Sequence, residues 1–114
     1  MTEKKTYQIN EEVHIIHVVE VIRHGYKVYV MGPKPVYGEY VDGRLVTEPP
    51  PEGEDPLVPP IYSGVIVPSP AVDYNYDITI YRFFEPGTHQ IYWKLDSLKS
   101  NVLTIKITAL TLLP

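Results

Sequence analysis

Short runs of β-branched and aromatic residues, separated by glycine and proline, constrain this chain more than any other feature of its sequence. Val, Ile, Tyr and Thr favour extended backbone, whereas proline interrupts helices and the interior of sheets. No window shows apolar residues at the helical period of about 3.6 residues. The pattern therefore predicts an all-β chain whose strands end at glycine and proline.

The glycine and proline residues between these runs predict seven or eight strands. We expect them at residues 13–22, 26–31, 36–41, 44–47, 61–67, 74–84, 89–95 and 102–112. Asp42 and Gly43 separate two of them and suit a two-residue type I′ hairpin, because both tolerate positive φ. Alternation predicts that Trp93 faces the core. Residues 13–22 are expected in the middle of a sheet, and 74–84 are expected to alternate as Tyr76, Ile78 and Ile80 before a bulge at residues 82–84.

The length of 114 residues predicts a single domain, residues 1–114, with one hydrophobic core. Residues 1–12 are polar and are expected to be partly flexible. Residues 48–60 contain six prolines and four acidic residues, which favours an extended acidic loop. Neither flank of this loop is long enough for an independent domain.

Composition excludes several classes of function. The chain has no cysteine, which excludes disulfides, thiolate zinc sites and cysteine nucleophiles. A net charge of −4 does not favour nucleic acid or an anionic membrane as a partner. Without a visible signal peptide or membrane-spanning run, we expect a cytoplasmic protein by default. Proline-rich loops without cysteine are also typical of thermophile proteins.

The residues that could support catalysis or metal binding do not form a recognisable set. His14 and His17 are three apart, which places them on opposite faces of a strand. Asp73, Asn75 and Asp77 lack the glycine and the terminal glutamate of a calcium loop, so they fit alternate polar positions on one strand. Phosphate-binding glycine loops and a nucleophile elbow are also missing. We therefore expect no enzyme activity, no cofactor and no metal.

A pattern near the end of the chain resembles immunoglobulin-like domains. Glu85, Gly87, His89 and Ile91 occupy alternate positions before Trp93. This spacing resembles the entry to the F strand, with His89 at the tyrosine-corner position and Ile91 at the second-cysteine position. Residues 100–105, SNVLTI, resemble the opening of the G strand, and residues 18–30 fit a B-turn-C arrangement.

This resemblance implies an antiparallel immunoglobulin-like β-sandwich of seven to eight strands. It also implies a structural corner at Glu85, Gly87, His89 and Trp93, in which an imidazole N–H replaces the usual phenol or the bond is lost. The architecture serves receptors, adhesins, inhibitors and carbohydrate-binding modules alike, so it implies no single function.

Ten tyrosines are too many for a core of this size. Alternation places Tyr81 and Tyr92 on outward faces, and Tyr62 lies near the proline-rich loop. These three residues are the candidate interaction surface of a non-enzymatic domain that binds a protein partner, or itself, through a sheet face or an edge strand. Two alternatives remain open: a carbohydrate-binding module using exposed tyrosines, and a protease inhibitor presenting residues 48–60 or the turn at 32–35.

Overall fold

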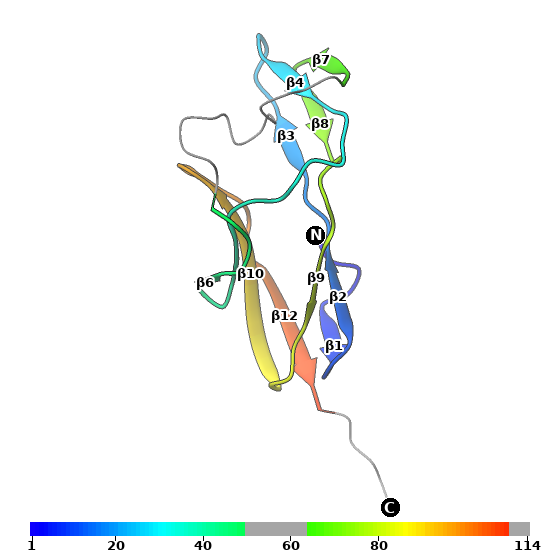
Figure 1. Ribbon diagram of the computed structural model, residues 1–114, viewed down its shortest axis with the longest axis vertical. Coiled ribbons are helices and arrows are strands. Elements are labelled where there is room, and N and C mark those ends of the chain that lie inside the picture. Colours follow the sequence, from blue (N-terminus) through cyan, green and yellow to red (C-terminus); the bar gives the residue numbers. More distant parts are fainter. Residues whose placement is uncertain (50–63, 110–114) are drawn as a thin grey trace, which may run out of the picture.

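The computed structural model describes residues 1–49 and 64–109, and every helix or strand assigned in these ranges is a β-strand (Figure 1). The all-β prediction is confirmed. The described strands are β1 (Thr6–Gln8), β2 (Glu12–Ile15), β3 (Val19–Val21), β4 (Lys27–Tyr29), β5 (Glu39–Val41), β6 (Arg44–Leu45), β7 (Ile66–Pro68), β8 (Ala71–Asp73), β9 (Thr79–Arg82), β10 (Gly87–Leu95), β11 (Leu98–Lys99) and β12 (Leu103–Thr108).

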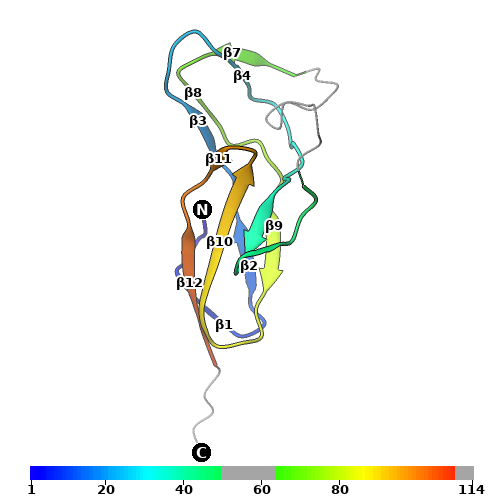
Figure 2. The ribbon, with the colours of Figure 1, turned by 90° about the vertical axis from the view of Figure 1, so that its left-hand side faces the viewer.

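The main sheet has the strand order β1-β12-β10-β5-β6, with β11 paired to the end of β10 (Figure 2). β10 is antiparallel to both β12 and β5, whereas β1 is parallel to β12. Side chains along β10 alternate, so that Ile91, Trp93 and Leu95 are buried. The predicted inward orientation of Trp93 is confirmed.

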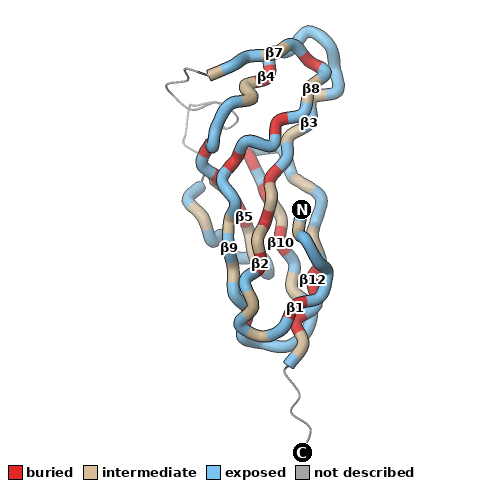
Figure 3. The backbone as a smooth tube through the Cα atoms, turned by 90° about the vertical axis from the view of Figure 1, so that its right-hand side faces the viewer, coloured by how far each residue is buried: buried red, intermediate tan, exposed pale blue. Residues whose placement is uncertain are grey.

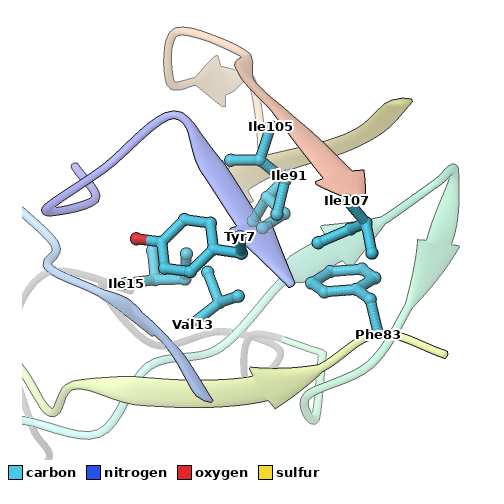
Figure 4. Close-up of a cluster of buried hydrophobic side chains, with 7 residues drawn as sticks. All are labelled: Tyr7, Val13, Ile15, Phe83, Ile91, Ile105 and Ile107. Atoms are coloured by element: carbon cyan, nitrogen blue, oxygen red, sulfur yellow. The ribbon is translucent and has the colours of Figure 1, made fainter. Parts of the chain in front are cut away.

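A second layer, formed by the antiparallel strands β2 and β9, covers the inner face of the main sheet. Seven buried side chains from both layers meet there and form the core (Figure 4). They are Tyr7, Val13, Ile15, Phe83, Ile91, Ile105 and Ile107. Burying each aliphatic side chain contributes about 1.5–3 kcal/mol. We call the main sheet together with β2 and β9 the body.

Beyond the body, the β2–β9 pair continues as a two-stranded antiparallel ribbon (Figure 1). β3 pairs with β8, and β4 pairs with β7. Between β3 and β4 the chain turns at Gly25, whose φ of +91° suits glycine. We call β3, β4, β7 and β8 the ribbon.

Residues 13–22 do not form the single central strand expected. The chain makes two short strands, β2 and β3, and each belongs to a two-stranded pair. The two strands within residues 18–30, for which a B-turn-C arrangement is expected, are β3 and β4, and neither belongs to the main sheet. Both pair with residues 66–73, a contact between distant segments that local pattern does not specify.

The faces assigned to residues 74–84 are inverted along β9. Ile78 and Ile80 are exposed, whereas Tyr81 is half-buried against the core and Phe83 is buried within it. The cause is register: Tyr81 lies opposite Val13, whose side chain is fully buried, so both point inward. The inward alternation continues through Phe83, without the predicted change of phase.

Two further segments can be compared with their predictions. Asp42 and Gly43 have φ values of +52° and +81° and join β5 to β6, which confirms the hairpin. β1 was not expected and lies within residues 1–12, where it buries Tyr7 beside β12. Most of the predicted loop at 48–60 lies outside the described residues, as does Tyr62.

Candidate functional site

A buried polar cluster lies between the two layers of the body. We define it as His17, Glu39, Thr79 and Tyr81. Glu39 begins β5, and its Oε1 accepts hydrogen bonds from the Tyr81 hydroxyl and, at 2.5 Å, from Thr79 Oγ1. Its Oε2 is bonded to His17 Nε2, while His17 Nδ1 lies 3.0 Å from the carbonyl oxygen of Asp77. Both carboxylate oxygens of Glu39 and both ring nitrogens of His17 thus have hydrogen-bond partners.

The electrostatics of this cluster favour a fixed network. Burial raises the pKa of Glu39, but hydrogen bonds from His17, Thr79 and Tyr81 outweigh it and hold that pKa below its ordinary value of 4.5. Burial, together with the bond to Glu39, raises the pKa of Tyr81. The network therefore favours the charged form of the Glu39 carboxyl.

A small cavity of about 60 Å³ adjoins His17, Glu39 and Trp93. Its volume suits a few water molecules, whereas ligand pockets usually measure about 300–1,000 Å³. The buried polar cluster therefore joins the two layers, and its cavity offers little space for a substrate.

A second buried ionic group links the ribbon to the segment before β5. Lys34 and Asp73 are both buried and form an ion pair. The Lys34 ammonium also donates to the carbonyl oxygen of Tyr29 and lies 4.6 Å from the centre of the Tyr76 ring. Gly32 permits this approach, because a Cβ there would lie 2.0 Å from the carbonyl oxygen of Asn75. The turn at residues 32–35 is therefore tied to the ribbon.

The structural corner is built around His89. Its Nε2 lies 2.8 Å from the carbonyl oxygen of Glu85, and its Nδ1 lies 2.6 Å from the Asp42 carboxylate. Burial lowers the pKa of His89, but these bonds outweigh it and raise that pKa above 6.5. Gly87 begins β10 with a φ of +121°, and Trp93 Nε1 donates to the carbonyl oxygen of Tyr37. The His89 imidazole thus joins the backbone at Glu85 to the hairpin at Asp42.

The candidate surface tyrosines lie in three different settings. Tyr92 is stacked on Tyr40 with ring centres 5.0 Å apart, and the Lys99 ammonium lies 4.5 Å from the centre of the Tyr92 ring. The Tyr92 ring is therefore already engaged within the chain. Tyr81 turns its hydroxyl inward to Glu39, which corrects its predicted outward orientation, and Tyr62 lies outside the described residues. The structure does not bring these three residues together.

Exposed apolar side chains instead follow the strand from β8 through β9. We define the apolar stripe as Val72, Tyr74, Ile78, Ile80 and Phe84, which are 47–67% exposed. Within β9, alternation turns Ile80 away from the body, because the neighbouring Tyr81 packs against the core. Among the described residues, β8 and β9 each pair with one strand only, which leaves their other edge without a strand partner.

Neither a metal site nor a membrane span is found in the part of the chain that the structure describes. No three His, Asp or Glu side chains converge there. His14 is partly exposed beside Glu12, and His17 is buried, which confirms their opposite orientations. Residues 1–49 and 64–109 contain no helix long and apolar enough to cross a membrane.

Sequence reasoning missed the two buried ionic groups and the apolar stripe. Glu, Lys and Asp are residue types that are usually exposed, and no local period marks a buried charge. The stripe has a signal in the alternation of Ile78 and Ile80, but alternation alone does not decide which face of a strand is buried. No family model, curated protein or solved structure matches this chain.

Proposed function

We propose that this chain is a non-enzymatic protein-interaction domain that associates with a second copy of itself through the apolar stripe. The observation that carries the proposal is the group of five exposed large apolar side chains along residues 72–84, in which the strand β9 pairs with β2 alone among the described residues. Such a strand combines an apolar surface with free backbone groups, and both favour the addition of another strand.

An immunoglobulin-like sandwich is the architecture we propose for this domain. The order β12-β10-β5 corresponds to strands G, F and C, and the β2–β9 pair corresponds to B and E. The chain order of these five strands also agrees. The bond between His89 and the carbonyl oxygen of Glu85 supports the corner assignment.

A second copy suits the stripe because its five members are apolar, and the neighbouring Arg82 is already paired with Glu12. In a two-fold contact the same patch is used twice, so a charged patch would repel itself. An antiparallel approach of two β9 strands centred on Thr79 places Ile78 opposite Ile80 of the other copy. Cross-strand pairs of this kind stabilise sheets.

The carbohydrate alternative receives less support from the geometry. Sugar stacking needs an accessible aromatic face, and the Tyr92 ring already contacts the Tyr40 ring and the Lys99 ammonium. The hydroxyl of Tyr81 is held inside by Glu39. The stripe therefore supports protein association better than sugar binding.

Sedimentation velocity over a range of protein concentrations tests the proposal. We expect a concentration-dependent rise to twice the monomer mass, and a dissociation constant at least tenfold weaker in Ile80→Lys, which buries a charge in the contact. Val102→Lys is the matched control, because Val102 is an exposed apolar residue away from the stripe. A monomer mass at every concentration, or equal weakening by both variants, would contradict the proposal.

A further inference from the structure

The turn between β3 and β4 forms an exposed apolar and basic tip. We define the ribbon tip as residues 22–27, and Figure 1 shows this turn at the end of the molecule opposite the C-terminus. Ile22 is 72% exposed, the highest value for a large apolar side chain among the described residues, and Tyr26 is 56% exposed. A Cβ added at Gly25 would meet no atom within 4 Å. The turn therefore projects into open space.

The backbone of the ribbon tip is held in place from behind. Tyr26 N donates to Ser69 Oγ at 2.9 Å, and Ser69 N donates to the carbonyl oxygen of Tyr26 at 2.9 Å. Ser69 is itself buried. These reciprocal bonds fix the turn, so little ordering is needed before its side chains make a contact.

The ribbon tip differs from the rest of the chain in the sign of its charge. Arg23, His24 and Lys27 are all exposed there. No Asp or Glu occurs in residues 21–31 or 64–72, although the chain contains fourteen. Arg23 and Lys27 therefore make the tip positive, whereas the remainder of the chain holds all fourteen acidic residues and is net negative.

We propose that the ribbon tip docks on an anionic membrane surface, with Ile22 and Tyr26 entering the headgroup region and Arg23 and Lys27 contacting lipid phosphates. Apolar burial together with attraction to anionic lipid is the chemistry by which proteins bind an interface. A projecting turn fits a soft lipid surface without a shaped cleft. The large exposed aliphatic side chain of Ile22 would contribute little to a contact with nucleic acid. The proposal is independent of self-association, which uses different residues.

Vesicle co-sedimentation of the full chain tests this docking. We expect binding to phosphatidylcholine vesicles containing about one-third phosphatidylglycerol, weakening as salt rises from roughly 0.1 to 0.5 M, and little binding to pure phosphatidylcholine. Each basic residue near an anionic surface contributes about fivefold. Arg23→Glu with Lys27→Glu should therefore lower binding at least about twentyfold.

Lys94→Glu with Lys106→Glu is the matched control, because it makes the same change in net charge at exposed positions on the main sheet. It should retain most of the binding. Equal loss in the two double variants would overturn the proposal, as would equal binding to neutral and anionic vesicles. Binding of a DNA duplex without binding of vesicles would also overturn it.

The absence of cysteine permits a direct test of insertion. His24→Cys, labelled with an environment-sensitive fluorophore, should shift to bluer emission with anionic vesicles. The shift should vanish when Ile22→Ser and Tyr26→Ser are added. The same label at Thr88→Cys, an exposed position at the start of β10, should show no shift. A shift at Thr88 without one at His24 would place the contact elsewhere and contradict the proposal.

Discussion

In the body, β10 and β12 bury isoleucines against β2 and β9, whereas β3, β4, β7 and β8 of the ribbon bury one large apolar side chain, Val28. The ribbon relies on the buried Lys34–Asp73 pair and on Ser69. Figure 3 shows the difference, with exposed residues predominating along the ribbon. A lone two-stranded ribbon is marginally stable in water, so these polar contacts, together with the packing of Val19 against the cluster that contains Trp93 and Leu95, hold it in place.

Breaking the ionic pair of the ribbon should have the largest effect on stability. Asp73→Asn leaves the Lys34 ammonium buried without a carboxylate, which costs about 3–5 kcal/mol. We expect urea unfolding to show this loss, and amide hydrogen exchange to show it most strongly in β3 and β8. The double variant Lys34→Met with Asp73→Leu is the control and should recover most of the stability. A loss below about 1 kcal/mol in Asp73→Asn would show that the ribbon does not depend on the pair.

Truncation in the body should cost somewhat less and act globally. Ile105→Ala removes a fully buried side chain and should lower the free energy of unfolding by about 3 kcal/mol. The control Ile80→Ala, at an exposed position, should change it by at most about 0.5 kcal/mol. Urea titrations compare the two. An equal loss of unfolding free energy in Ile105→Ala and Ile80→Ala would mean that Ile80 is buried, which contradicts the outward face assigned to it on β9.

Acid should weaken the body through Glu39. The folded-state pKa of Glu39 lies below its ordinary value of 4.5, so its contribution is complete above pH 4.5 and is lost as pH falls through the folded pKa. We expect Glu39→Gln, although less stable overall, to show a flatter decline in unfolding free energy below pH 4.5. Glu3→Gln should keep the wild-type slope. The same slope in all three proteins would exclude this role.

His89 should have the smallest effect on stability, and its pH dependence should be opposite to that of Glu39. Its folded-state pKa is raised above 6.5, so the bonds to Glu85 and Asp42 stabilise fully below pH 6.5 and weaken as pH rises through the folded pKa. His89→Gln should remove this dependence and cost about 1 kcal/mol at pH 5.5. His24→Gln, at an exposed position, serves as the control. Thermal unfolding at pH 5.5 and 8.5 measures the difference, and an unchanged pH dependence in His89→Gln would contradict it.

Local pattern predicted those features that depend on neighbours in the chain. The hairpin at Asp42 and Gly43 follows from their positive φ, and the inward Trp93 follows from alternation on β10. The ribbon could not be predicted, because its strands pair across a long separation in sequence. The apolar stripe was missed for the same reason: the β2–β9 register, and not the spacing of Ile78 and Ile80, decides which face of β9 is buried.

Hydrogen–deuterium exchange at low and high protein concentration tests the central claim, association through the apolar stripe. We predict that amides of β8 and β9 become more protected as concentration rises, while those of β6 and β11 in the main sheet do not change. Ile80→Lys should abolish the increase. Protection that is independent of concentration, or that rises in β6 instead of β9, would contradict the account.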